Sequence, residues 1–493
     1  MRKCGILLPV SSLASNYGIG SFSEKAYEFV DFLNKAGQSY WQILPLGPTG
    51  YGDSPYQSFS TYAGNPYFID LDLLVKDGLL KKKDCKCDFG DNDQYVDYEK
   101  IYNARMDVLH IAYKNANLAE DTRYQKFVKK SRKWLNDYAL YMAVKKGFNQ
   151  KGWNEWDEDI KLRKPEAMQH YEETYASDIE FYKFQQYLFQ KQWKDLKKYA
   201  NKKGVEIVGD IPIYVAFDSA DTWANPELFQ LDKNCNPIKV AGCPPDAFSK
   251  TGQLWGNPLY RWSYHKKTGF EWWMRRIEHC YELYDVVRID HFRGFDEYYA
   301  IPYGNKTAEF GRWEKGPGYQ LFKTMKEKLG EKSVIAEDLG FLTPSVISLV
   351  LKTGYPGMKI LQFAFDSREE SDYLPHNYKN NCVVYTGTHD NDTTLGWYEK
   401  FGKKDKKFAN NYLNIKSDKD VPEAFIRAAL SSVADTAIIP LQDYLELGSE
   451  ARINTPSTLG DNWKWRLIGN ELTDDLATKI RKLTKLYGRL QNR

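Results

Sequence analysis

Short apolar runs alternate with amphipathic stretches from the start of the chain. The run at residues 6–9 predicts a first strand, and residues 40–46 predict a second. Between them, the apolar positions 26, 29, 30 and 33 step by three or four, which predicts a helix over 24–36 that ends at Gly37. The chain therefore begins as strand, helix, strand.

The same alternation returns after residue 180. Strands are predicted near residues 205, 286, 333, 359, 383 and 437, and the lengths between them suit helices rather than hairpins. The predicted helices cover 181–202, 270–284, 321–330, 343–352 and 422–434. Thr343 followed by Pro344 is typical of a helix start. With the first two strands, this pattern indicates an eight-stranded (β/α)8 barrel.

An open, doubly wound parallel sheet is the alternative fold. No glycine-rich phosphate loop follows a strand directly, and Gly50-Tyr51-Gly52 does not fit a dinucleotide fingerprint. The expected fold is therefore an α/β TIM barrel with large inserted, mainly helical subdomains. A C-terminal β-sandwich is not expected, because only about fifty residues follow the eighth strand.

Three stretches interrupt the alternation. Residues 47–68 are rich in Gly, Pro, Ser and Tyr and predict an irregular loop, either a binding loop or a structural Ω-loop. Residues from about 70 to 180 are charged and largely helical, which predicts an inserted helical subdomain between strands 2 and 3. Residues from about 211 to 265 are rich in proline and predict a second long loop, an active-site insertion after strand 3. The whole chain, 1–493, is expected to form one catalytic barrel domain.

Composition and charge limit the classes of molecule that the chain is expected to bind. The 69 Lys and Arg residues nearly balance the 66 Asp and Glu residues, and the net charge of +3 does not suggest nucleic acid or an anionic membrane as a partner. Aromatic residues make up 15% of the chain. Aromatic rings stack on bases, apolar ligands or sugar rings, so this excess favours a ligand-binding surface, although a simple abundance of Tyr explains it equally well.

Cysteine usage and the N-terminus favour a cytoplasmic protein. The seven cysteines are scattered, and Cys85-Lys86-Cys87 has neither a zinc nor a thioredoxin spacing, so free thiols in a reducing compartment are expected. The N-terminal apolar run is too short for a signal peptide, and no run of eighteen apolar residues occurs.

Four of the predicted strands end in acids, which are Asp210, Asp290, Glu337 and Asp390. A single acid at such a position is weak evidence, because acids also cap the following helix. In a barrel, however, these strand ends meet at one rim, where four carboxylates repel each other. Repulsion between carboxylates does not stabilise the fold, so the pattern favours a functional acidic site.

Two carboxylates that flank one bond suit glycosidic cleavage. Arg288 and Asp290 share one face of their strand, so Arg288 is expected to hold the pKa of Asp290 down. Glu337 has apolar neighbours and nearby anions, which raise a carboxyl pKa. Two alternatives remain open at this point. Arg288 and Asp290 could form a structural ion pair, or the acids could bind a divalent metal together with His291 and His389.

Several motifs resemble a known family. The stretches 288–294 (Arg-Ile-Asp-His-Phe-Arg-Gly), 336–340 (Ala-Glu-Asp-Leu-Gly) and 388–391 (Thr-His-Asp-Asn) resemble the nucleophile, acid/base and third-acid motifs of the α-amylase clan. The stretches 11–13, 51–56, 209–215 and 255–258 look specifically like 4-α-glucanotransferases, also called amylomaltases. The resemblance runs in order from residue 6 to about residue 466.

This resemblance implies roles for particular residues. Asp290 would be the nucleophile and Glu337 the general acid and then base. Asp390 would bind sugar hydroxyls and stabilise the transition state. The remaining substrate-binding residues implied are Ser54, Tyr56, Asp210, Gln253, Trp255, Arg288, His291, His389 and Asn454. The two reacting carboxyls would lie about 5–5.5 Å apart, as in retaining enzymes.

The implied activity is transfer of α-1,4-glucan segments from a malto-oligosaccharide donor to the 4-hydroxyl of glucose or another glucan, including amylose and starch-derived glucans. A hydrolase of the same clan would share these residues, whereas a non-catalytic glucan-binding protein should lack at least one acid. No cofactor and no metal are expected. Many α-amylases carry Asn-His after the third-strand Asp, whereas the equivalent stretch of this chain is Tyr214-Val215-Ala216, which argues against their calcium site. A monomer or weak homodimer is expected.

Overall fold

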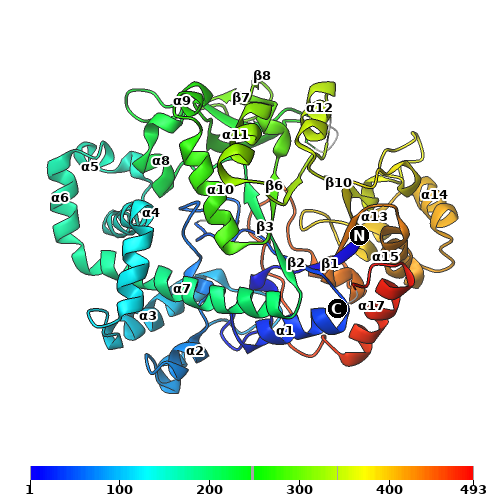
Figure 1. The fold of residues 1–493 in the computed structure, drawn as a ribbon, viewed down its shortest axis with the longest axis horizontal. Coiled ribbons are helices and arrows are strands. Elements are labelled where there is room, and N and C mark those ends of the chain that lie inside the picture. Colours follow the sequence, from blue (N-terminus) through cyan, green and yellow to red (C-terminus); the bar gives the residue numbers. More distant parts are fainter. Residues whose placement is uncertain (1, 51, 246–248, 341, 492–493) are drawn as a thin grey trace.

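An eight-stranded parallel sheet forms the centre of the computed structural model, which describes residues 2–50, 52–245, 249–340 and 342–491 (Figure 1). Its strands lie in the order β10-β11-β12-β1-β2-β3-β6-β9. The outermost strands meet where the Ala336 N–H donates to the Pro356 carbonyl at 2.9 Å, which nearly closes the sheet into a barrel. The bounds are β1 Lys3–Leu7, β2 Tyr40–Gln42, β3 Glu206–Pro212, β6 Val286–Asp290, β9 Val334–Ala336, β10 Gly357–Ile360, β11 Cys382–Tyr385 and β12 Thr436–Pro440.

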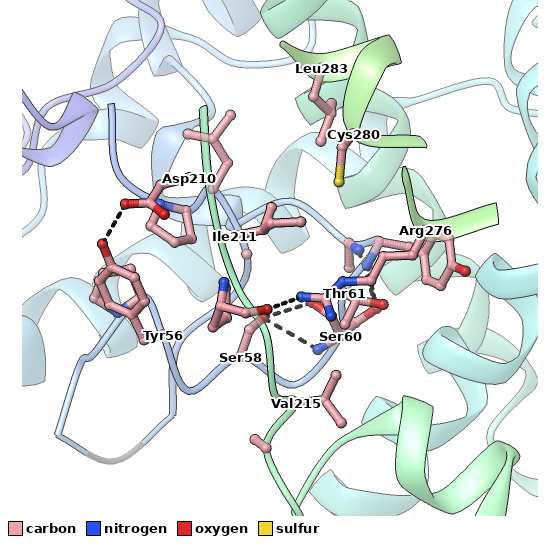
Figure 2. A pocket seen from close by; sticks show the side chains of 18 of the residues that line it. Tyr56, Ser58, Ser60, Thr61, Asp210, Ile211, Val215, Arg276, Cys280 and Leu283 are labelled. Carbon is pink, nitrogen blue, oxygen red and sulfur yellow. Dashed lines mark hydrogen bonds between the residues drawn. The ribbon is translucent and has the colours of Figure 1, made fainter. Parts of the chain in front are cut away.

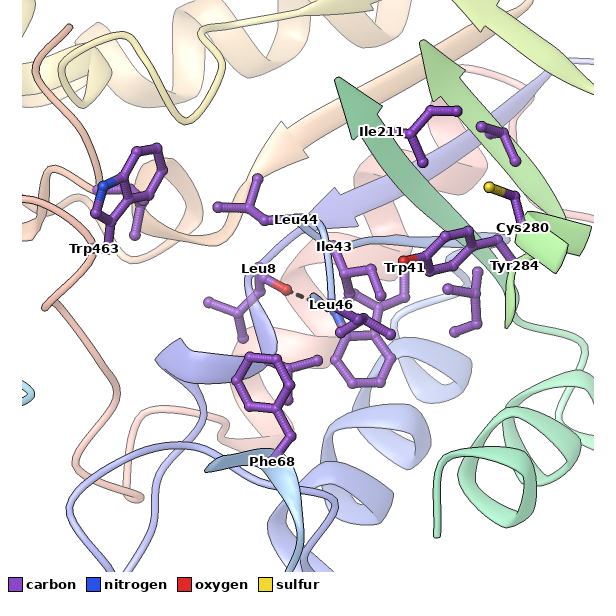
Figure 3. Packing of buried hydrophobic residues seen from close by; sticks show 14 of the residues in the cluster. Leu8, Trp41, Ile43, Leu44, Leu46, Phe68, Ile211, Cys280, Tyr284 and Trp463 are labelled. Atoms are coloured by element: carbon purple, nitrogen blue, oxygen red, sulfur yellow. Dashed lines mark hydrogen bonds between the residues drawn. The ribbon is translucent and has the colours of Figure 1, made fainter. Parts of the chain in front are cut away.

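All eight predicted strands are confirmed, and their alternation builds two cores. One set of strand side chains packs together as a separate cluster that includes Leu7, Val208, Val286, Met358 and Ile438. The intervening residues join the main core between the strands and the helices, where Trp41 is fully buried and donates to the Leu8 carbonyl at 2.9 Å (Figure 3). Val286 and Val208 lie two residues before Arg288 and Asp210, so these two polar side chains continue the first set toward the strand ends.

Helices surround the barrel, and the five that were predicted after residue 180 are confirmed, as is the first. The Thr343 hydroxyl caps its helix by accepting from the Val346 N–H. The last helix, which was not predicted, lies beside the first one (Figure 1). The surrounding helices are α1 Glu24–Lys35, α7 Ala176–Lys202, α10 Glu271–Leu283, α11 Tyr319–Leu329, α12 Pro344–Thr353, α13 Thr394–Lys400, α14 Lys403–Leu413, α15 Val421–Ser431, α16 Leu441–Tyr444 and α17 Asp474–Leu486.

The stretch between β2 and α7 is mainly helical. It contains α2 Leu71–Lys76, α3 Tyr98–Asn115, α4 Thr122–Gly147, α5 Glu158–Lys161 and α6 Pro165–Thr174. Helix α4 packs along α7, and α5 and α6 lie at the left edge of the molecule, away from the barrel (Figure 1). In the described part of the preceding loop, residues 47–50 and 52–68, the regular features are an isolated bridge between Thr49 and Ser58 and a short 3-10 turn at Pro66–Phe68.

The prediction of one long loop over 211–265 was incomplete. This stretch contains α8 Ala220–Ala224, α9 Trp262–Lys267, β4 Lys239–Cys243 and β5 Gln253–Pro258. Strands β4 and β5 join β7 Glu297–Pro302 and β8 Arg312–Lys315 in a second, antiparallel sheet, in the order β5-β4-β7-β8. The register of β4 and β5 shifts between Val240 and Gly242. Short strands with a bulge and a glycine carry little periodic signal, and β7, their partner, lies far along the chain.

Two further expectations concern the chain as a whole. None of the seven cysteines is joined in a disulfide in the part of the chain that the structure describes. Among the described residues, no helix combines the length and the apolar character that crossing a membrane requires.

Arg489 ties the two ends of the chain together. Its side chain is fully buried, and its guanidinium donates to the carbonyls of Lys3 at 2.9 Å, Leu430 at 2.7 Å and Ala434 at 2.9 Å. We expect Arg489→Met to lower the free energy of unfolding by about 3 kcal/mol or more, because the substitution removes the guanidinium donor from all three carbonyls, of which Leu430 keeps a second donor, Arg2. Urea unfolding followed by fluorescence measures this difference.

Lys482→Met, at an exposed position of α17, is the matched control and should change the free energy of unfolding by less than about 0.5 kcal/mol. Equal effects of the two substitutions would contradict the role assigned to Arg489.

Candidate active site

The predicted acids meet at the carboxyl ends of adjacent strands. In the register of β3, β6 and β9, Asp210 pairs with Arg288, and Ile289 pairs with Ala336. Asp290 and Glu337 are the residues that follow this last pair, so they emerge side by side at the rim of the barrel. Asp390 comes from the loop after β11 and lies close enough that its charge acts on Asp290.

Arg288 lies between two carboxylates. Its side chain is buried, and Nη1 contacts the two Asp210 carboxylate oxygens at 2.8 and 2.7 Å and the Asp290 Oδ1 at 2.9 Å. Asp210 is itself fully buried. Burial acts to lower the pKa of Arg288, but Asp210 and Asp290 hold it well above its usual range. The predicted pair of Arg288 and Asp290 is thus part of a triad, in which Arg288 lies between Asp210 and Asp290.

The pKa of Asp290 differs from the expectation. Burial raises it to about 6, against the opposing effect of Arg288. Asp210 and Asp390 add to the increase. The prediction that Arg288 would hold this pKa down was therefore wrong in its net direction. The physical reason is that Arg288 also neutralises Asp210, so one cation serves two carboxylates in a site with little water.

Glu337 is the more easily protonated of the two adjacent acids. Burial and the charge of Asp290 raise its pKa to about 7, as the sequence predicted. Its two carboxylate oxygens accept from the backbone N–H groups of His291, at 2.7 Å, and Leu339, at 2.8 Å. His291 has a φ of 53°, in the left-handed region that a histidine rarely adopts, so this backbone bond occurs at a strained position of the kind found in functional sites.

Asp390 is held in its charged form. Burial acts to raise its pKa, but His389, whose Nε2 is 3.3 Å away, and Asn454, whose amide donates to Oδ1 at 2.7 Å, keep the pKa well below its usual range. Arg452 fixes the loop by donating to the main-chain carbonyl of Asp390 at 2.7 Å. The three acids therefore differ in their proton affinity, with Glu337 highest and Asp390 lowest.

Tyr56 connects the two sides of the site. Its hydroxyl lies 2.8 Å from Asp210 Oδ2 and 2.9 Å from His389 Nε2, and its ring stacks on the His389 ring with centroids 5.3 Å apart. The hydroxyl has one proton, which it donates to Asp210, so it accepts from an Nε2–H of His389. Figure 2 shows the hydrogen bond between Tyr56 and Asp210 at the edge of a small cavity that continues past Ile211 toward Cys280 and Leu283.

Trp255 and Gln253 lie on β5, which reaches the rim from the second sheet. The Trp255 ring meets the His291 ring edge to face at 4.8 Å, and its Nε1–H donates to Gln253 Oε1 at 3.2 Å. Ser54 has a more indirect place, because its hydroxyl accepts from the Tyr56 N–H at 3.3 Å and so shapes the loop. Tyr51, which belongs to the same family motif, lies outside the described residues.

Two residues near the site were not predicted. Trp463 is buried with its ring 5.9 Å from Tyr56 and 6.1 Å from His389. Arg452 lies two residues before Asn454 and binds the loop of Asp390. Both are in an irregular segment after the eighth strand, where no periodic pattern is available. The one available signal was the nearness of Arg452 to a residue already named.

The metal alternative receives no support from this arrangement. Among the residues that the structure describes, no three His, Cys, Asp or Glu side chains are placed to share one metal ion. Instead, Asp210 is bound by Arg288 and Tyr56, and Asp390 by Asn454.

A barrel whose rim brings together an ionised carboxylate and a protonatable one is the architecture of enzymes that act on glycosidic bonds. Comparison with known proteins makes this class specific. A family model described as 4-alpha-glucanotransferase matches residues 8–471. The chain therefore belongs to the 4-α-glucanotransferase family, and the resemblance in the sequence is confirmed.

Individual relatives agree over the full length. A 4-alpha-glucanotransferase from Clostridium butyricum is 55% identical over 485 residues, 98% of this chain and 100% of the relative. One from Thermus thermophilus is 46% identical, with 99% of each chain covered. The solved amylomaltase from Streptococcus agalactiae in complex with acarbose has a TM-score of 0.97 at 42% identity, with 100% of both chains covered.

A more distant structure shares the fold. The amylomaltase from Corynebacterium glutamicum has a TM-score of 0.79 at 17% identity, over 99% of this chain and 75% of that one. The family model and the 4-α-glucanotransferases that match over the full length show that this chain is an enzyme with glucanotransferase activity rather than a hydrolase.

The two raised pKa values predict a bell-shaped pH profile. Below about pH 6, Asp290 gains a proton and loses its charge, and above about pH 7, Glu337 loses the proton that the general acid implied by the family resemblance would donate. We therefore expect kcat/KM for maltotriose to be highest between these values and to fall about tenfold for each pH unit beyond either limb. Initial rates from pH 4 to 10 test this, and a profile that stays flat up to pH 9 would contradict it.

Proposed function

We propose that this chain transfers α-1,4-glucan segments from a donor malto-oligosaccharide to the 4-hydroxyl of glucose or another glucan, with retention at the anomeric carbon. The observation that carries the proposal is the position of Asp290 and Glu337, next to each other on paired strands with the higher pKa on Glu337. Retaining enzymes require such a pair, one ionised and one protonated, with the carboxyl groups about 5–5.5 Å apart.

In the first step, Asp290 attacks the anomeric carbon of the donor as its glycosidic oxygen takes the proton of Glu337. The bond to the leaving sugar breaks, and a β-glucosyl ester forms on Asp290. The leaving sugar departs as a neutral alcohol, and Glu337 is left ionised. Arg288 stays charged throughout and limits the protonation of Asp290 before the attack.

In the second step, Glu337 acts as a base. The ester has no charge, so the Coulombic contribution of Asp290 that raises the pKa of Glu337 is absent in the intermediate. The two backbone N–H donors then favour the ionised form of Glu337. Glu337 removes the proton from the acceptor 4-hydroxyl as that oxygen attacks the anomeric carbon. A new α-1,4 bond forms, and Asp290 is released as a carboxylate.

Asp390 stabilises the transition state. Because His389 and Asn454 keep it ionised, its negative charge is available where positive charge develops on the sugar ring, and it accepts bonds from sugar hydroxyls. Arg288, His291, His389 and Asp210 line the same donor site. Asn454 binds Asp390 directly and contacts sugar from the eighth-strand side.

Transfer requires that a sugar hydroxyl reach the ester before water does. Tyr56 and Trp255 project into the rim from opposite segments, the loop after β2 and strand β5. We assign to them the holding of the acceptor ring and the exclusion of water. Ser54 supports Tyr56, and Gln253 supports Trp255, through the hydrogen bonds described above.

The wider organisation is part of the same proposal. Residues 1–493 form one catalytic barrel domain, about 70–180 is an inserted helical subdomain, and about 211–265 is the active-site insertion after the third strand. The donors are malto-oligosaccharides, amylose or starch-derived glucans, and glucose serves as an acceptor. The enzyme works in the cytoplasm as a monomer or weak homodimer.

Asp290→Asn tests the nucleophile. We expect the rate of maltotriose conversion to fall by about a thousandfold or more, because the amide cannot form the ester, while glucan binding is retained. The product ladder and calorimetric binding of maltotriose measure the two effects. The wild type should give glucose and longer oligomers without net loss of glycosidic bonds, and net bond loss would contradict the transferase proposal.

Trp255→Ala tests the exclusion of water. We expect the ratio of transfer to hydrolysis to fall several-fold, because removal of the ring opens the acceptor side to water. The measurement counts free glucose and reducing ends from maltotriose. Leu486→Ala, at an exposed apolar position of α17, is the matched control. A ratio unchanged in an active Trp255→Ala enzyme would remove Trp255 from this role.

A further inference from the structure

Exposed apolar side chains gather on one face of the second sheet and on its loops. Ile238 is 51% exposed, Tyr303 50% and Phe310 75%, and Leu254 and Trp313 are also exposed. Large apolar patches on a soluble protein mark a site where something binds. We call these five residues the aromatic face, because three of them are aromatic rings.

The register of the strands places them together. Leu254 pairs with Gly242, Gly242 with Tyr299, and Tyr299 with Trp313, which makes one row across four strands. Paired residues project to the same side of a sheet, so Leu254 and Trp313 share a face. Gly242, in the middle of the row, has no side chain, and the Gln253 main chain and the Ile301 side chain occupy the space beside it, so the row is closely packed between the two exposed side chains.

The loops extend this face. The Tyr303 N–H donates to the Ile238 carbonyl at 3.2 Å, which adds one pair beyond Lys239 and Pro302. Phe310 precedes Gly311, whose N–H is held at 2.9 Å by the Tyr299 hydroxyl. Beneath them, Val240, Tyr299, Ile301 and Ala308 form a small cluster of their own. The opposite face, with Ala241, Tyr298 and Ala300, is part of the main core. Strands β7 and β8 lie at the upper edge of the molecule in Figure 1.

The charges of the sheet favour a neutral ligand. Its four strands contain five charged residues, and each is in an ion pair within the sheet. Lys239 and Arg312 bind Glu314 at 2.6 and 2.8 Å, and Lys315 binds Glu297 at 2.6 Å. No strand of this sheet therefore offers an uncompensated charge to an anionic or cationic partner.

The aromatic face is continuous with the active site. Along β5, Gln253 and Trp255 belong to the site, and Leu254 between them points to the aromatic face. On β8, at the opposite edge of the sheet, the centre of the Trp313 ring lies 4.0 Å from the guanidinium carbon of Arg293. Arg293 follows Asp290 by three residues. A glucan that leaves the rim past Trp255 therefore meets Leu254 next.

We propose that the aromatic face binds the part of a long α-1,4-glucan that extends beyond the active site. This inference rests on the proposed function, since it takes the same substrate class. Pyranose rings have apolar faces that pack on aromatic rings, and a neutral polymer needs no charged partner. The face therefore selects chain length, while the rim performs the chemistry.

The test compares a short and a long substrate. In Tyr303→Ala/Phe310→Ala, we expect kcat/KM for amylose to fall about threefold to tenfold, with kcat/KM for maltotriose within about twofold of wild type. Migration of the wild type in native gels that contain amylose should be retarded, and the variant should be retarded less. Phe310→Tyr should keep the wild-type behaviour. Leu486→Ala, an exposed apolar residue on α17, is the matched control.

Three results would overturn the inference. They are equal losses on both substrates, no loss on amylose, and a dimer by light scattering that the double substitution converts to a monomer, which would make a second copy the occupant. If the wild type fails to disproportionate maltotriose, the proposed function fails instead. The gel retardation still tests the aromatic face in that case, because it requires no transfer.

Discussion

The site depends on one buried guanidinium held between two carboxylates. Arg288 contacts Asp210 and Asp290 inside the mouth of the barrel, where none of the three charges is stable alone. Their geometry is set by the strands, because Asp210 and Arg288 are register partners and Asp290 follows two residues later on the same face. Removing Arg288 would leave the carboxylates of Asp210 and Asp290 without their shared cation, so Arg288 sets both the arrangement at the barrel mouth and the ionisation of Asp290.

Loops that are distant in the sequence are joined through this triad. Asp210 accepts from Tyr56, which comes from the loop after β2, and Tyr56 accepts from His389, which comes from the loop after β11. The segment after the eighth strand then reaches Asp390 through Asn454. These side-chain bonds make the irregular loops as well defined as the strands, which is what a preorganised site for a charged transition state requires.

The barrel and its three acids were predictable, because buried parallel strands form short apolar runs and each acid follows one of them. The sharing of Arg288 by two carboxylates was not predictable. The alternation of side chains along one strand places Arg288 beside Asp290, but it does not identify Asp210 on the neighbouring strand. The pKa of Asp290 was predicted in the wrong direction for the same reason. The second sheet was also missed, because its short strands pair across distant parts of the chain and include a bulge.

The barrel strands and the segments outside them contribute different side chains to the candidate site. Asp290 ends β6 and Glu337 directly follows β9, so the two carboxyls of the proposed bond cleavage are positioned by the barrel strands. Tyr56 and Trp255, by contrast, come from the loop after β2 and from the second sheet. In the proposed mechanism, water and a sugar hydroxyl both attack the glucosyl ester through an oxygen atom. The carboxyls of Asp290 and Glu337 therefore do not discriminate between these two nucleophiles. In the proposed function, the choice between transfer and hydrolysis is therefore made by groups that hold the rest of the acceptor, and the groups assigned to this, Tyr56 and Trp255, lie outside the barrel strands.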